Sequence, residues 1–295
     1  MLPDYPIIDA HLHIQPWEMV KPEAQKTLFV RSRAGMGDPR QYMDPDAGPA
    51  RLIAYMDANN VEQVAIINYV SPNVIGFQEH GVNEFSAACA ARAPGRIIPF
   101  GGIDVHDPVD IDRRMDYILG QLGIKAIKIH PPHQLAYANA YRDGGRIPAL
   151  ATVYQKAQEY RVPVMIHTGT SVFHGARNKY ADPMPLDDVA IDFPDLQIIL
   201  AHGGRPIWMD TTLFLLRRHK NIWLDISSVP PARLLDYFPW LPRVAERAIF
   251  GSDWPGPGIP GIRENVEALL ELPLDPAVRR MILRDNALRL FGIGP

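Results

Sequence analysis

The stretch IIDAHLHIQP, residues 7–16, carries two histidines one residue apart at the end of the first apolar run. Seven further apolar segments follow it in the chain, namely QVAIINYV (63–70), RIIPFGGID (96–104), IKAIKIH (124–130), VPVMIH (162–167), LQIILAH (196–202), NIWLDIS (221–227) and RAIFGSD (247–253). Short, nearly continuous apolar runs are typical of strands that are covered on both faces. Segments with helical spacing separate them. This alternation predicts an α/β fold, a closed parallel (β/α)8 TIM barrel, with an open doubly wound sheet as the alternative.

The composition indicates one domain spanning residues 1–295, since 47% hydrophobic residues suffice for a large core. A net charge of −3 argues against nucleic-acid binding. No apolar stretch is long enough to cross a membrane and no signal sequence is apparent, so we expect a cytoplasmic location. The single cysteine, Cys89, cannot form an intramolecular disulfide. The partner we expect is a small-molecule substrate, and a homodimer or higher homo-oligomer stays open.

Polar residues gather at the ends of the predicted strands, where the active sites of TIM barrels lie. Of the ten histidines, only His80 and His219 fall in predicted helices. The strand ends carry His11, His13, His130, His167, His202, Asp225 and Asp253.

The pair His11 and His13 should share one face of the first strand with Asp9, because side chains two residues apart point the same way. For an isolated pair, two histidines hydrogen-bonded in a polar layer would be the better explanation. A closed barrel, however, also brings His167, His202 and Asp253 to the same point, and together these side chains supply the ligands of an open zinc site.

Six motifs in this chain carry a family resemblance, in the order DAHLHIQP, IKAIKIHP, VMIHTG, LAHGG, FGSDWP and DNALRLFG. Together they span nearly the whole chain. The chain resembles the metal-dependent amidohydrolase superfamily, in its amidohydrolase-related branch, which is aminocarboxymuconate-semialdehyde decarboxylase-like. The resemblance implies a (β/α)8 barrel that binds one divalent metal ion, most simply Zn²⁺, through His11, His13, His167 and Asp253. It also implies that His202 stands beside the metal and touches the reacting group.

The fourth strand leaves the number of metal ions open. Binuclear relatives bridge two metals with a carboxylated lysine at this strand, and Lys128 is the candidate here. Because His130 lies nearer the mouth than Lys128, we expect one metal. Lys128 and His130 are then candidates for substrate binding, and a structural hydrogen bond of His130 is the alternative.

The predicted reaction is hydrolysis of an amide, ester or lactone of a small, carboxylated substrate by metal-bound water. Asp253 would act as the base and His202 would orient the water or stabilise the oxyanion. The alternative is non-oxidative decarboxylation of an unsaturated or aromatic acid. The H-x-H-x-x-P form of residues 11–16 resembles the signature of the decarboxylases in this branch. A metal-binding scaffold without catalysis is the third possibility.

Loop residues should select the substrate. Residues 28–49 form a long segment with little periodicity, as expected of a lid over the barrel mouth. Arginines can clamp a carboxylate with paired hydrogen bonds. The candidates are Arg31, Arg33 and Arg40 in this segment, His174 and Arg177 in the loop after the fifth strand, and Trp254 beside Asp253.

Overall fold

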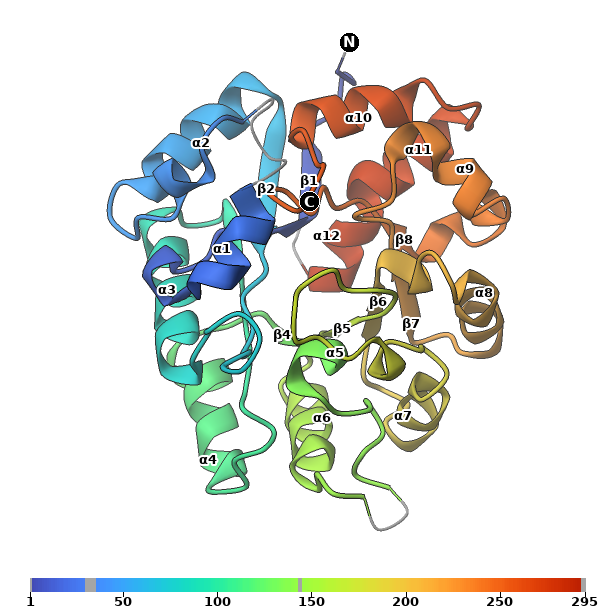
Figure 1. The fold of residues 1–295 in the computed structure, drawn as a ribbon. Helices are drawn as coiled ribbons and strands as arrows, with labels where there is room; N and C mark the ends of the chain where they lie inside the picture. Colours follow the sequence, from blue (N-terminus) through green and yellow to red (C-terminus); the bar gives the residue numbers. More distant parts are fainter. Residues whose placement is uncertain (1, 30–35, 143–144, 293–295) are drawn as a thin grey trace.

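The computed structural model describes residues 2–29, 36–142 and 145–292, and it confirms the predicted TIM barrel. Eight parallel strands follow one another around the barrel in chain order, with helices outside them (Figure 1). The strands are β1 (Ile7–Leu12), β2 (Val61–Ile66), β3 (Ile97–Gly101), β4 (Ala126–Ile129), β5 (Val164–His167), β6 (Ile198–Ala201), β7 (Ile222–Asp225) and β8 (Ala248–Ile249). Each of them falls within or overlaps a predicted apolar segment.

Helices connect successive strands along the chain and cover the outside of the barrel. In the described residues they are α1 (Pro22–Phe29), α2 (Gly48–Ala58), α3 (Glu79–Arg92), α4 (Ile111–Asp116), α5 (Pro131–Gln134), α6 (Ala149–Glu159), α7 (Leu186–Asp192), α8 (Met209–Arg218), α9 (Leu234–Tyr237), α10 (Ile262–Leu270), α11 (Pro276–Arg280) and α12 (Asn286–Phe291). A π-helical turn, Met281–Asp285, joins α11 to α12.

The barrel is closed by the segment that follows β8, which runs beside β1. The Asp253 N–H donates to the His11 carbonyl at 2.8 Å, and the His13 N–H donates to the Trp254 carbonyl at 2.7 Å. The backbone bonds that close the ring thus fix the predicted metal ligands of the first and last strands next to each other.

Two apolar layers hold the barrel together. The outer layer lies between the strands and the helices, and the inner one fills the barrel and extends onto α12. The inner layer contains Ile8, Ala10, Ala65, Ile67, Ile98, Phe100, Ala126, Met165, Ile199, Trp223 and Ile249. The side chains of this layer are apolar, and the histidines and charged residues of the cavity lie beyond them toward the carboxyl ends of the strands, so the site rests on a packed floor.

The first strand departs from strict alternation. Its pairing with β2 shifts register between Asp9 and Leu12. Asp9 does not join the histidines, contrary to the expectation of a shared face, because its Oδ1 accepts from the N–H groups of His11 and Ser252. Burial raises the pKa of Asp9 to about 7. Its role in this structure is to tie β1 to the segment after β8.

Asn286, in the DNALRLFG motif, anchors α12 to the barrel. Its buried side-chain amide donates to the carbonyls of Ala245 and Ala248, both at 2.7 Å. Asn286→Ala should lower the free energy of unfolding by about 2 to 3 kcal/mol, because it leaves two buried carbonyls unsatisfied. Urea denaturation checks this, with Asn73→Ala on an exposed loop as the control. Equal stability of the two variants would contradict the anchoring role.

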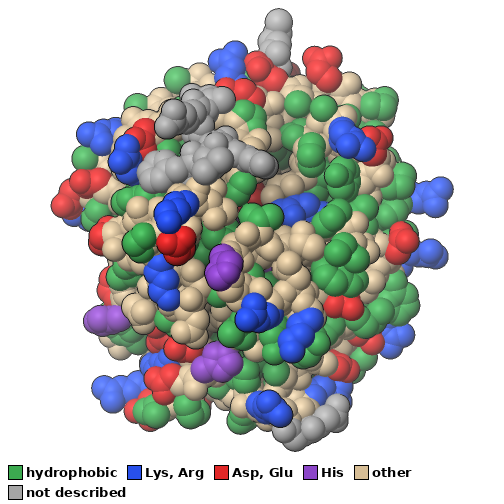
Figure 2. Space-filling view, viewed as in Figure 1, with side chains coloured by type: hydrophobic (Ala, Val, Ile, Leu, Met, Phe, Trp, Pro, Cys, Tyr) green, Lys and Arg blue, Asp and Glu red, His purple; other side chains and the backbone are tan. Residues whose placement is uncertain are grey.

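The surface agrees with the small net charge. On the face shown in Figure 2, Lys and Arg side chains alternate with Asp and Glu. None of the helices in the described ranges is both long and apolar enough to cross a membrane. Cellular location and oligomeric state stay predictions.

Candidate metal centre and cavity

The carboxyl ends of the strands surround a cavity of about 700 Å³. This volume lies in the range of pockets that enclose small molecules. The wall combines apolar and aromatic side chains with a group of histidines and charged residues. The lining residues used below are His13, Tyr69, Phe77, Lys128, His130, His167, Ser171, Phe173, His202, Arg205, Ser228 and Asp253.

His11, His13 and Asp253 converge on one point beside this cavity. The Nε2 atoms of the two histidines lie 3.3 Å apart. Asp253 Oδ1 lies 3.4 Å from His11 Nε2 and 3.1 Å from His13 Nε2. Burial alone would raise the pKa of Asp253, but the attraction of positive charge nearby, that of Arg205 included, holds it below its ordinary value. Asp253 is therefore a carboxylate.

The outer nitrogens of both histidines are held by acceptors. His11 Nδ1 lies 2.5 Å from Asp225 Oδ2, and His13 Nδ1 lies 3.2 Å from the carbonyl of Ile67. An acceptor at Nδ1 places the ring proton there and leaves a lone pair on Nε2. Two Nε2 lone pairs and a carboxylate oxygen then face each other with no proton between them. This donor set fits a divalent cation.

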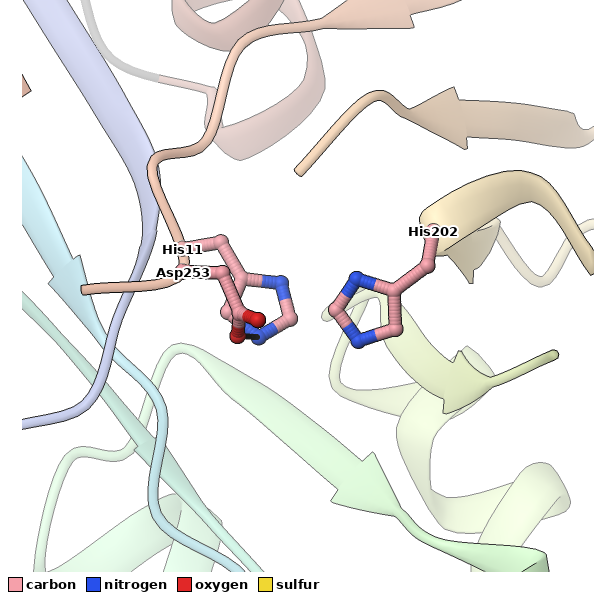
Figure 3. Close-up of side chains that lie close together, drawn as sticks. All are labelled: His11, His202 and Asp253. Atoms are coloured by element: carbon pink, nitrogen blue, oxygen red, sulfur yellow. Dashed lines mark ion pairs between the residues drawn. The ribbon is translucent and has the colours of Figure 1, made fainter. Parts of the chain in front are cut away.

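His202, the residue directly after β6, faces the same point (Figure 3). One donor atom from each of His11, His202 and Asp253 lies within 4.8 Å of the other two. His202 Nδ1 lies 3.1 Å from the Ser227 carbonyl, so Nε2 is the unprotonated nitrogen of a neutral ring. The backbones of His202 (φ 67°) and Asp253 (φ 64°) both lie in the left-handed region. Residues other than glycine that are held in this strained conformation cluster at functional sites.

His167 lies farther from this point. Its Nε2 is 3.1 Å from the Gly169 carbonyl, and its ring stacks on His130 with centroids 3.9 Å apart. Its ring centroid is 4.8 Å from that of His202. Among the described residues, the group of donor atoms within 4.8 Å of one another includes neither His167 nor His13, but His13, unlike His167, has contacts with His11 and Asp253. Its role as a metal ligand stays a prediction.

One buried and one partly buried cation line the cavity. Lys128 is 1% exposed, and burial lowers its pKa to about 8 against the opposing charges of Asp225 and Asp253. No described residue hydrogen-bonds its Nζ. Arg205 donates to the Thr170 carbonyl and to Ser228 Oγ, and burial lowers its pKa as well. A negatively charged ligand would offset both desolvated cations.

The other predicted substrate residues lie elsewhere or outside the described part. Arg31 and Arg33 are outside the described residues. Arg40 pairs with Asp38 on the surface. His174 and Arg177 are exposed and do not line the cavity, and Trp254 is fully buried against Tyr42, with ring centroids 5.5 Å apart.

The predicted lid, residues 28–49, is described only in part. Leu28 lines the cavity, whereas Pro39–Tyr42 forms a short 3-10 helix and α2 begins at Gly48. The side chains of Met36 and Tyr42 are part of the hydrophobic core. Closure of this segment over the cavity stays a prediction.

Sequence reasoning missed Arg205, and it gave no role to Asp225. Arg205 follows the glycine pair after His202 in AHGGRP, and this position one turn past a strand end could have pointed to the cavity. Asp225 stood out only as a polar strand end. Its partner His11 is far away in sequence, so only the folded barrel shows the contact.

Comparison with solved structures gives whole-chain matches. One is an uncharacterized TIM-barrel protein from Bordetella bronchiseptica, with 23% identity, a TM-score of 0.71 and coverage of 97% of this chain and 98% of that one. Another is 5-carboxyvanillate decarboxylase from Sphingomonas paucimobilis, with 18% identity, a TM-score of 0.68 and coverage of 99% and 100%. A third is a dihydroxybenzoic acid decarboxylase from Polaromonas sp. JS666, with bound manganese and 2-nitroresorcinol, at 17% identity, a TM-score of 0.69 and coverage of 98% and 97%.

Because these three structures share only 17 to 23% sequence identity with this chain, their likeness to it concerns the fold alone. A comparison with curated proteins gave no match. The family model described as amidohydrolase matches residues 8–293, nearly the whole chain, including every member of the histidine and aspartate cluster. The chain belongs to the amidohydrolase family.

Proposed function

We propose that the protein is a metal-dependent decarboxylase that removes CO2 without oxidation from an aromatic or unsaturated carboxylic acid. The observation that carries this proposal is the cavity, where the cluster of His11, His13 and Asp253 lies beside two cations, the buried Lys128 and the partly buried Arg205. Cations shielded from solvent in this way attract an anionic substrate more strongly than exposed ones do, because water screens them less. The decarboxylases of aromatic acids among the structural neighbours support the same reaction.

The prediction of hydrolysis, which the sequence favoured, is wrong. The named enzymes among the structural neighbours are mostly decarboxylases of hydroxybenzoic acids, and this favours the alternative reaction. The physical reason for the error is that the motifs specify a metal-binding set of imidazoles and a carboxylate. Such a set can activate water or hold a substrate acid, and the motifs do not encode which bond is broken.

The residues present fit one divalent cation. His11, His13 and Asp253 would hold it, with His167 as a further predicted ligand. When bound, such a cation polarises substrate oxygens and stabilises negative charge that develops on the substrate. The sequence favoured zinc, while two of the neighbouring decarboxylases contain manganese. Elemental analysis of the purified protein tests which ion this chain retains.

The side chains of the cavity would bind the substrate and transfer the proton. Arg205 and Lys128 bind the anionic groups of the substrate, and Phe77 and Phe173 contact its ring or chain. When the carbon–carbon bond breaks, its electron pair stays on the carbon that lost CO2, and that carbon then takes up one proton. Asp253 and His202 are the groups beside the cluster that can carry this proton.

Reaction in D2O distinguishes decarboxylation from hydrolysis. We expect each turnover of an aromatic acid such as 2,6-dihydroxybenzoate to release one CO2 and to place one deuterium on the carbon that held the carboxylate. Carbon dioxide trapping and mass spectrometry of the product measure both. Across a panel of aromatic and unsaturated acids, no CO2 release combined with acid release from esters or lactones would contradict the proposed function.

A further inference from the structure

Three side chains form a hydrogen-bonded chain behind the cavity wall. The Tyr69 hydroxyl lies 3.1 Å from His133 Nδ1, and His133 Nε2 lies 2.8 Å from Ser171 Oγ. Tyr69 follows β2, His133 lies in α5 and Ser171 follows β5, so three separate segments meet here. Tyr69 and Ser171 line the cavity, whereas His133 is buried and joins them from outside it.

The chain holds a fixed number of protons. Burial and the charge of Lys128 lower the pKa of His133 to about 3, so its imidazole is neutral and carries one proton. With the two hydroxyl protons, three protons serve two hydrogen bonds. One proton is therefore left over, and it lies on the hydroxyl at one end of the chain.

The surroundings favour the Tyr69 end for this spare proton. Ser171 Oγ also accepts from the Phe173 N–H at 3.4 Å, which leaves the Ser171 O–H free to donate to His133 Nε2. His133 Nδ1–H then donates to the Tyr69 oxygen. Within the described residues, the Tyr69 hydroxyl has no other hydrogen-bond partner, so its O–H can donate into the cavity.

The Tyr69 end lies close to the proposed reaction centre. The Tyr69 ring is 6.4 Å from the His13 ring and stacks on His130 at 5.1 Å, between centroids. Tyr69 therefore lies within reach of the other substituents of a substrate whose reacting carboxylate occupies the His11, His13 and Asp253 cluster. An oxygen substituent there would meet a buried donor whose direction is set by two further residues.

We propose that Tyr69, His133 and Ser171 form a relay that recognises a second acidic oxygen group on the substrate. This inference rests on the proposed function, and it assigns three residues of this chain to the recognition of an oxygen group beyond the reacting carboxylate. Tyr69 is the contact residue. His133 and Ser171 are positioning residues that keep the Tyr69 proton directed into the cavity, because loss of the Ser171 hydroxyl lets His133 take the opposite tautomer.

Binding of two probes to the metal-loaded protein tests the relay without turnover. Both probes carry a carboxylate on a benzene ring, and isophthalate carries a second one. Isothermal titration should give a Kd for isophthalate at least about tenfold below that for benzoate. Tyr69→Phe should reduce this ratio about tenfold, and Ser171→Ala should reduce it several-fold. Tyr137→Phe, on a partly exposed tyrosine outside the cavity, should leave it unchanged.

The ratio of two affinities separates recognition from general loss of structure, because a damaged fold weakens both probes. In the Tyr69→Phe background, Ser171→Ala should have no further effect on the ratio. Equal affinity of the wild-type protein for both probes overturns the relay, and so does an unchanged ratio in Tyr69→Phe. A ratio lowered by Tyr69→Phe but not by Ser171→Ala also overturns it. Absence of CO2 release would instead count against the proposed function, and the binding result would stand by itself.

Discussion

Asp253→Asn should lower kcat about a thousandfold while the protein keeps its fold. The change removes the carboxylate that faces His11 and His13, and with it both a predicted metal ligand and a group that can carry the proton. Asn keeps the shape of the side chain. It also tolerates the left-handed backbone of this position, where φ is 64°, better than most residues.

The experiment compares kcat, metal content and thermal unfolding for Asp253→Asn and for a matched control, Asp57→Asn. Asp57 is 61% exposed and pairs with Arg96 on the surface, so its neutralisation should change the rate by less than about twofold. Thermal unfolding near that of the unaltered protein would show that the loss of rate is local. If Asp253→Asn kept a rate within tenfold of the unaltered protein, Asp253 would have no part in the chemistry.

The barrel could be predicted from the sequence because parallel strands buried on both faces leave a strong pattern. Each predicted apolar segment contains part of a strand, although β8 itself is short. The division of the last helical segment into α11 and α12 by a π-helical turn could not be predicted. Hydrophobic spacing indicates which face of a helical segment is buried, and over so few residues it does not distinguish a single π-helical turn from the α-helix around it.

The candidate site was predictable only where it lies on strands. His11, His13, His202 and Asp253 sit at strand ends or directly after them, and barrel geometry brings such positions together. Arg205 and the relay lie in loops and short helices, whose paths depend on tertiary packing. The position of Asp9 was misjudged because a register shift in β1 breaks the alternation that the prediction assumed.

Asp225→Asn should weaken metal binding about 10- to 100-fold, the usual effect of removing a carboxylate that orients a metal-binding histidine. Asp225 Oδ2 holds the proton of His11 on Nδ1, while Oδ1 accepts from the Ser227 N–H at 2.9 Å. An Asn side chain that keeps the Ser227 contact turns its NH2 group toward His11 Nδ1. His11 must then move its proton to Nε2, and the lone pair that faces His13 and Asp253 is lost.

Metal titration against a competing chelator measures this affinity, and kcat is followed in the same titration. Because Asp225 acts through His11, saturating metal should return much of the lost kcat in Asp225→Asn, whereas Asp253→Asn should stay slow at any metal concentration. Ser227→Ala provides a graded comparison, since its hydroxyl lies 3.1 Å from His11 Nδ1 and 2.8 Å from Asp225 Oδ2. An Asp225→Asn variant with unaltered metal affinity would show that the proton on His11 is not set by this carboxylate, and the argument for a divalent cation at His11 Nε2 would then lose its main support.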